Sequence, residues 1–208
     1  MSMWNTEREI VLEAAQQLAQ KGYVTGTMGN VSMRLTAPDG VERLAITPSN
    51  RYYDTLILDD IIITDFNGKR VEGKFKPSVE TVLHIEIYRA RREVNAVVHA
   101  HSIFGSVAAV AGLDIPAILD DQLVCLGGEI KVAPYALPHS QDLVRNVISA
   151  LGPRNAVILA NHGTLTVGKD MKEAFTNCEV LEKTAKIYIN ALHTGKVNLL
   201  PSQATDTD

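Results

Sequence analysis

A tight-turn signal, Asn67-Gly68, constrains the fold of this chain more than any other sequence feature. It separates two runs with strand character, Ile61–Phe66 and Lys69–Glu72. Asn-Gly is the preferred pair in the two-residue turn that joins two antiparallel strands. This part of the chain therefore predicts a β-hairpin, and with it a sheet that contains antiparallel strands.

Further strands and helices are expected around this hairpin. A second turn signal, Asp39-Gly40, separates the strand-like runs Val31–Leu35 and Arg43–Thr47. Apolar residues recur at helical spacing in several other segments. The expected helices are Thr6–Lys21, a segment that Ser78 caps and that runs to about Arg92, Ser102–Ala111, Gln141–Leu151 and Lys169–His193. The remaining strands are expected in the run from Ala96, at Ile130–Ala133 and on both sides of His162.

The mixture of helices with antiparallel strands predicts an α/β fold of three layers, α/β/α, with a predominantly antiparallel central sheet. A chain of 208 residues with 46% hydrophobic content has enough apolar surface for the core of one domain. We expect this single domain to span residues 1–202. The polar tail, residues 203–208, is expected to be disordered.

Composition argues against several classes of function. A net charge of −4 does not favour nucleic-acid or anionic-membrane partners, which require a basic face. No apolar run reaches the roughly 20 residues of a membrane-spanning helix, and the start, Met1–Asn5, lacks a signal-peptide pattern. We therefore expect a cytoplasmic protein, in which Cys125 and Cys178 are buried free thiols.

A strand that ends in two histidines is the main candidate for chemistry. The apolar run Ala96–Val98 leads into His99-Ala100-His101. Because alternate residues of a strand share a face, the two imidazoles lie side by side, where two neutral nitrogens can bind one divalent metal ion. Glu80, at the start of a helical stretch, and His162, after a second apolar run, are further candidates. A hydrogen-bonded histidine pair without metal is the alternative.

Five short motifs occur in the order in which a known family carries them. They are Gly26-Thr27-Met28-Gly29-Asn30-Val31-Ser32, Ile46-Thr47-Pro48-Ser49, Pro77-Ser78-Val79-Glu80, His99-Ala100-His101 and Asn161-His162-Gly163. Together they resemble the class II aldolase/adducin family, over about residues 7 to 192. The resemblance implies that His99, His101 and His162 bind zinc, and the same ligands also suit manganese or cobalt. It assigns Glu80 as the acid/base residue, which can also bind the metal.

The resemblance also implies a site for a substrate phosphate. The residues that match it are Thr27, Asn30, Ser49, Asn50 and Ser78. Their hydroxyl, amide and backbone donors would hold the dianion without a basic patch.

The chain departs from the family's aldolases at some positions. Val79 replaces a serine, and Asn50 replaces a glycine of the phosphate loop. The aldolases have a catalytic tyrosine soon after the segment that matches residues 115–118, whereas this chain has Asp120 and Asp121 there. Either aspartate occupies the tyrosine's place, and an acidic residue in this region resembles the family's 4-epimerases. The polar tail also lacks the tyrosine that functions near the C-terminus of the aldolases.

These features predict a zinc-dependent aldolase that reversibly cleaves a small ketose 1-phosphate, of the L-fuculose, 5-deoxyribulose or methylthioribulose type, to dihydroxyacetone phosphate and an aldehyde. The alternatives are an L-ribulose-5-phosphate 4-epimerase, a methylthioribulose-1-phosphate dehydratase and a decarboxylase of a phosphorylated sugar acid. A non-catalytic adducin-like scaffold is the alternative from another class, against which the three histidines and Glu80 argue. The resemblance further implies a homotetramer with active sites between subunits.

Two other histidines have open interpretations. His84 lies four residues after Glu80 on the same helix face, either as a partner of the site or as a packing residue. His139, in Pro138-His139-Ser140, either reaches the substrate from its loop or is solvated.

Overall fold

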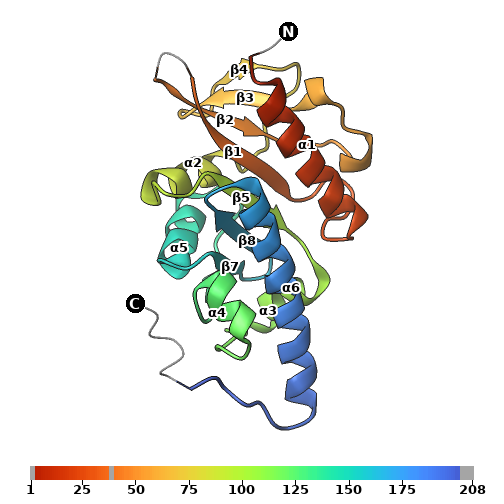
Figure 1. Cartoon of the computed structure of the whole chain (residues 1–208), viewed down its shortest axis with the longest axis vertical. Coiled ribbons are helices and arrows are strands. Elements are labelled where there is room, and N and C mark those ends of the chain that lie inside the picture. Colours follow the sequence, from red (N-terminus) through yellow and green to blue (C-terminus); the bar gives the residue numbers. More distant parts are fainter. Residues whose placement is uncertain (1–2, 38–39, 202–208) are drawn as a thin grey trace.

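The computed structural model describes residues 3–37 and 40–201, in which helices surround one sheet (Figure 1). The helices are α1 (Asn5–Gln20), α2 (Thr81–Ala90), α3 (Ile103–Ala111), α4 (Asp120–Leu126), α5 (Gln141–Leu151) and α6 (Met171–His193), with short 3-10 helices at Tyr53–Thr55 and Leu58–Asp60. The strands are β1 (Asn30–Thr36), β2 (Glu42–Ile46), β3 (Ile62–Asp65), β4 (Arg70–Glu72), β5 (Ala96–Ala100), β6 (Lys131–Ala133), β7 (Ala156–Leu159) and β8 (Gly163–Gly168). The predicted turn residue Asp39 and the predicted disordered tail, residues 203–208, lie outside the described residues.

The strands form one mixed sheet in the order β4-β3-β2-β1-β5-β8-β7-β6. Neighbouring strands are antiparallel, except that β6 and β7 run parallel. The hairpin predicted from Asn67-Gly68 joins β3 to β4, and Gly68 has a φ of 77° there. The prediction of a predominantly antiparallel sheet therefore holds only in part. The parallel pair arises because α5 connects β6 to β7 as a βαβ unit, which a three-residue strand does not reveal in the sequence.

Helices pack on both faces of this sheet. Successive residues of β5 point to opposite faces, so that Val98 packs in a core with α1 and α6, whereas Val97 packs in another with α2 and α5. A third cluster joins α3 and α4 to α6 beside β7. This packing leaves the end of β5 as the place where side chains from several elements meet.

The predicted elements are confirmed with small shifts, except close to Glu80. Helix α2 begins at Thr81 rather than at Ser78, so the prediction that Ser78 caps it is wrong. The Ser78 hydroxyl instead accepts the backbone N–H of Glu80 at 3.2 Å, and the Thr81 hydroxyl donates to the Ser78 carbonyl at 2.5 Å. A tight turn thus precedes the helix and places Glu80 at its N-cap position. Helix α4 lies where the sequence predicts no regular element.

Two predictions from composition can be compared with the structure. Cys178 is buried and free, as expected, but Cys125 is only partly buried because it lies on the short outer helix α4. Among the residues described, no helix is both long and apolar enough to cross a lipid bilayer.

Candidate active site

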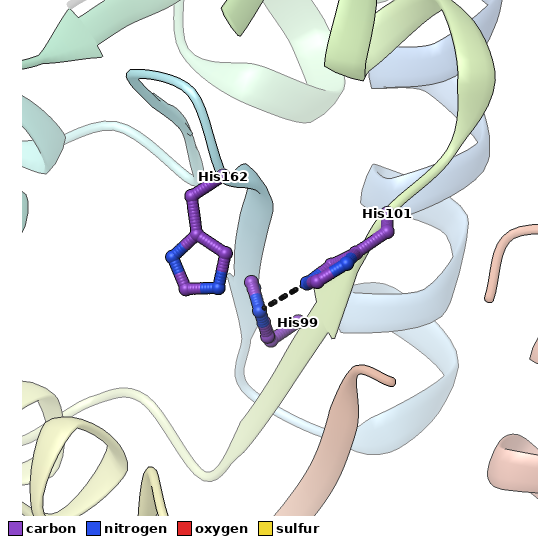
Figure 2. Close-up of side chains that lie close together, drawn as sticks. All are labelled: His99, His101 and His162. Carbon is purple, nitrogen blue, oxygen red and sulfur yellow. Dashed lines mark hydrogen bonds between the residues drawn. The ribbon is translucent and has the colours of Figure 1, made fainter. Parts of the chain in front are cut away.

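Three histidines from neighbouring strand ends face one another. His99 belongs to β5, His101 follows that strand, and His162 precedes β8. Ala100 is paired with Thr164 across the antiparallel strands β5 and β8. The C-terminal end of β5 and the N-terminal end of β8 therefore lie side by side, at the same end of these two central strands. Figure 2 shows the three rings gathered there, and their ligand nitrogens all lie within 4.8 Å of one another. The structure thus brings together the three predicted metal ligands.

The contacts of His99 show which of its nitrogens faces the other groups. Its Nδ1 lies 2.9 Å from the carbonyl oxygen of Thr164. A carbonyl only accepts, so Nδ1 of His99 donates to Thr164, and Nε2 is the nitrogen that faces the other groups. Nε2 of His99 lies 3.0 Å from Nε2 of His101, within hydrogen-bond distance, and 3.2 Å from Oε2 of Glu80. Electron-rich atoms this close together fit a divalent cation held among them, and imidazoles with one carboxylate suit zinc, cobalt or manganese.

Burial keeps the imidazoles of His101 and His162 neutral. It lowers the pKa of His101 to about 3 and that of His162 to about 4, and the adjacent His99 adds to both effects. Both values lie far below neutral pH. Because a metal ligand must be deprotonated, these two side chains are ready to bind a cation at pH 7.

Glu80 supplies the carboxylate of the site and is only 7% exposed. Its Oε1 lies 3.5 Å from Nε2 of His162, and its Oε2 accepts a 2.7 Å hydrogen bond from Nδ2 of Asn30. Asn30 reaches it because β1 and β5 pair Asn30 with His99. Burial by itself raises the pKa of Glu80, but His99, His162 and the Asn30 amide outweigh it and lower the pKa to about 2. Glu80 is therefore ionised at neutral pH, as a base or a metal ligand must be.

Two glycines allow the backbone to approach the histidines closely. A Cβ atom on Gly163 would lie 2.5 Å from the Ala100 carbonyl oxygen and 2.8 Å from Cδ2 of His101. A Cβ atom on Gly29 would lie 2.8 Å from the carbonyl oxygen of His99. Neither position has room for a side chain, so both glycines are needed to assemble the site.

A buried glutamate of α6, Glu182, fixes the chain that follows His101. Its carboxylate accepts hydrogen bonds from the Ser102 hydroxyl at 2.6 Å and from the N–H groups of Phe104 and Gly105 at 2.9 and 2.8 Å. These bonds hold the first turn of α3 in place. The sequence analysis missed Glu182, because a single glutamate within a long helix gives no sign of a partner 80 residues earlier.

His101, His162 and Glu80 border a cavity of about 380 Å³, and His99 lies buried beside them. The residues predicted to bind phosphate all line it: Thr27, Asn30, Ser49, Asn50 and Ser78. Met28, Pro138 and His139 line it as well. Asn50 and His139 have φ values of 57° and 65°, and such left-handed backbone in residues other than glycine is typical of functional sites. His139 thus lies at the cavity, the first of the two positions considered for it.

Asn30 lines the cavity, but its amide has another partner there. Its Nδ2 donates to Glu80, and its Oδ1 is buried without a hydrogen-bond partner in the described part of the chain. The bond to Glu80 uses one of the two N–H donors of Nδ2, and the other stays available to a ligand in the cavity. In the structure Asn30 positions Glu80.

The two candidate aspartates lie away from this cavity, at the start of α4. Neither Asp120 nor Asp121 lines it. Asp121 forms an ion pair with Lys183 of α6, whereas Asp120 is exposed. Within one chain, the structure therefore does not bring them to Glu80.

His84 lies behind the site rather than in the cavity. It is fully buried, with Nδ1 2.6 Å from the Ser32 hydroxyl, which lies 2.8 Å from the hydroxyl of Tyr88. Its Nε2 has no hydrogen-bond partner among the described residues. Burial lowers the pKa of His84 to about 3, so it is neutral at pH 7. The structure thus favours a packing residue within a buried polar chain.

This low pKa predicts that the protein loses stability in mild acid. Below the ordinary histidine pKa of 6.5 the unfolded chain binds a proton that the folded chain excludes down to about pH 3. The contribution of this one group to the free energy of unfolding is therefore fully present above pH 6.5. Below that pH it falls by about 1.4 kcal/mol per pH unit. We expect His84→Gln to reduce this dependence of the free energy of unfolding on pH, as measured by urea unfolding at several pH values between pH 7 and pH 5. Equal slopes in the two proteins would contradict the prediction.

Comparisons with known proteins match most of the chain. The family described as Class II Aldolase and Adducin N-terminal domain matches residues 9–189. The chain is 34% identical over 197 residues to a 5-deoxy-D-ribulose 1-phosphate aldolase of Bacillus thuringiensis serovar kurstaki, covering 94% of this chain and 90% of that one. It is 34% identical over 195 residues to a 5-methylthioribulose-1-phosphate/5-deoxyribulose-1-phosphate aldolase of Rhodospirillum rubrum, covering 94% and 86%. The solved structure of an L-fuculose 1-phosphate aldolase superposes with a TM-score of 0.90 at 30% identity, covering 99% and 94% of the two chains.

Proposed function

The chain belongs to the class II aldolase and adducin family, and on this premise we propose that it reversibly cleaves a small ketose 1-phosphate to dihydroxyacetone phosphate and an aldehyde. As an aldolase it is a carbon–carbon lyase, of a class that depends on a divalent metal ion. The observation that carries the proposal is the cluster of three imidazoles and the Glu80 carboxylate, of which Glu80, His101 and His162 line a cavity that also presents hydroxyl and amide side chains. The names of its aldolase relatives support the substrate class.

We infer that the metal is zinc and that His99, His101 and His162 hold it. Their nitrogens lie close enough together to bind one ion, and three protein ligands leave a position open for substrate. When bound, such a cation stabilises the negative charge that develops on the ketone oxygen as the bond between C3 and C4 breaks.

The polar lining of the cavity suits the phosphate end of the substrate. Thr27, Ser49 and Ser78 offer hydroxyl donors, and the left-handed backbone at Asn50 turns the loop there. These neutral donors hold a dianion without a lysine or arginine in the lining. We assign the phosphate to them.

Glu80 moves the proton on carbon. In the direction of bond formation, its carboxylate removes a proton from C3 of dihydroxyacetone phosphate, and in cleavage the protonated carboxyl returns it to the same carbon. The Asn30 amide and the contacts with His99 and His162 fix the carboxylate for this transfer.

We infer that a second acid/base group, which takes the proton of the C4 hydroxyl during cleavage, comes from a neighbouring copy of the chain. Asp120 is the better candidate, because Asp121 is engaged by Lys183, while the side chain of Asp120 is exposed and forms no ion pair or hydrogen bond with the residues that the structure describes. Such a site requires the homotetramer with shared active sites that the family resemblance implies.

Substitution of the two aspartates distinguishes them. We expect Asp120→Asn to lower kcat roughly 100-fold, the usual loss on removal of an acid/base group. Asp121→Asn breaks only a partly exposed ion pair with Lys183, worth about 1 kcal/mol of stability or less, and should leave kcat nearly unchanged. Mixed assemblies of Asp120→Asn with Glu80→Gln should regain part of the activity, since some sites then combine both intact residues. No recovery in the mixture would argue against a shared site.

The proposed function is tested by a coupled assay for dihydroxyacetone phosphate released from a panel of ketose 1-phosphates, with and without a chelator. Release that the chelator abolishes and zinc restores supports the proposal. Binding of metal without release from any sugar would contradict it and favour a 4-epimerase or dehydratase. Absence of metal binding would favour the scaffold.

A further inference from the structure

A second, smaller cavity of about 80 Å³ adjoins the first between α2 and α5. Three residues line both cavities: Val79, Glu80 and His139. The smaller cavity therefore begins at the acid/base residue. It has none of the donors assigned to phosphate and none of the three metal-binding histidines in its lining.

The walls of this side cavity are apolar. Leu83 on α2 and Leu143 and Val144 on α5 line it, and all three are buried. The hydroxyl of Ser140, also in the lining, already accepts a hydrogen bond from the N–H of Leu143 at the start of α5. A hydroxyl group placed against Leu83, Leu143 and Val144 finds no hydrogen-bond partner on these side chains, whereas a methyl or thioether group fits their chemistry.

The arrangement of groups around the two cavities determines which end of the substrate enters which cavity. The phosphate donors lie in the larger cavity only, Glu80 lies in both, and the apolar residues lie in the smaller cavity only. A ketose phosphate held by its phosphate, with its reacting carbons at Glu80, directs its remaining carbons away from the phosphate donors. The smaller cavity is the continuation of the site in that direction.

We propose that this side cavity binds the non-phosphorylated end of the sugar and selects a methyl or thioether end over a hydroxymethyl end. The inference rests on the proposed aldolase function and narrows its substrate class. Val79, which is 62% exposed and shared by the two cavities, is the residue through which this preference can be altered without disturbing the core.

The backbone at His139 supports a fixed entrance to this side cavity. His139 has a φ of 65°, an unfavourable conformation for a residue with a Cβ atom. The next residue, Ser140, caps α5 through its side chain, which ties the loop to the helix that forms one wall. A rigid loop here gives the cavity a defined size, as discrimination between similar substrates requires.

The test compares 5-deoxyribulose 1-phosphate with ribulose 1-phosphate, which differ only by the C5 hydroxyl. For the metal-loaded enzyme we expect kcat/KM to favour the deoxy sugar by about 10- to 100-fold, the range that an apolar pocket supplies against one extra hydroxyl. Val79→Thr keeps the shape of the side chain and adds a hydroxyl partner, so it should reduce the preference several-fold. Val71→Thr makes the same change on the exposed edge strand β4, outside both cavities, and should leave the preference unchanged.

The outcomes separate this inference from the function on which it rests. Equal cleavage of the two sugars, or faster cleavage of ribulose 1-phosphate, would overturn the side-cavity assignment while the aldolase activity stands. A strong preference that Val79→Thr leaves intact would also overturn it. Release of dihydroxyacetone phosphate from no ketose 1-phosphate would overturn the proposed function itself.

Discussion

Glu80→Gln is expected to lower kcat for ketose 1-phosphate cleavage by about 1,000-fold, within the range that general acid–base groups contribute. Glutamine keeps the shape of the side chain and an oxygen for the Asn30 amide, but it cannot take up or release a proton. No other acidic residue lines this cavity among the described residues, so no neighbouring side chain can take over the proton transfer of Glu80. The coupled assay for dihydroxyacetone phosphate measures the loss.

A second measurement isolates the proton transfer from cleavage. Dihydroxyacetone phosphate alone should exchange its C3 proton with deuterated solvent on the wild-type enzyme, as followed by NMR, and this exchange should be lost in Glu80→Gln with the metal content retained. Glu86→Gln is a matched control on the same helix, where the side chain forms a partly exposed ion pair with Arg89. An unchanged exchange rate in Glu80→Gln would remove Glu80 from the mechanism.

His101→Asn is expected to weaken zinc binding by at least 100-fold and to abolish cleavage. Loss of a group that only supports a ligand costs roughly 10- to 100-fold in metal affinity, and loss of a direct ligand costs more. His101 is the suitable choice because it is partly exposed, whereas His99 is fully buried and hydrogen-bonded to Thr164. Competition with a chromophoric chelator measures the affinity.

The same variant gives a readout that does not depend on activity. A ligand that binds only the folded protein stabilises it by about 4 kcal/mol at 1,000 times its Kd. Zinc should therefore raise the Tm of the metal-free wild type and leave that of His101→Asn almost unchanged. His193→Asn is the matched control, because His193 lies exposed at the end of α6, where its ring bonds to the carbonyl of Ile189 in its own helix. Equal rises in Tm for the wild type and His101→Asn would show that the metal binds elsewhere.

Most of the secondary structure and the three histidines that the structure brings together could be predicted from the sequence. The turn at Asn67-Gly68 and the helix at Gln141–Leu151 depend on residues close together in the chain, and both were found where local pattern placed them. His99 and His101 share a face because strand residues alternate. Glu80 and His162 were candidates because each lies at the end of a predicted element, but their roles came from motif resemblance, since nothing in their spacing requires them to meet.

The tertiary structure changed the roles of several other residues. Ser78 was predicted to cap a helix and instead shapes the turn before it. Asn30 was predicted to hold phosphate, and cross-strand pairing with His99 gives its amide a second role as a hydrogen-bond donor to Glu80. Asp121 pairs with Lys183, and Glu182, which no motif indicated, holds the start of α3. Each of these roles depends on a neighbour that is not apparent from nearby residues in the sequence.

The sequence by itself determined the local elements and the chemistry available to the site: three imidazoles, one carboxylate and a set of neutral donors for an anion. Only the tertiary structure decided which nitrogen of His99 faces Glu80, which cavity Glu80, His101 and His162 line, and which apolar side chains border Glu80 on its other side. The physical reason is that turns, caps and side-chain periodicity act within a few residues of the chain. The pairing of β1, β5 and β8 and the packing of α2 on α5 join segments far apart in sequence, and a cavity forms only where such segments meet.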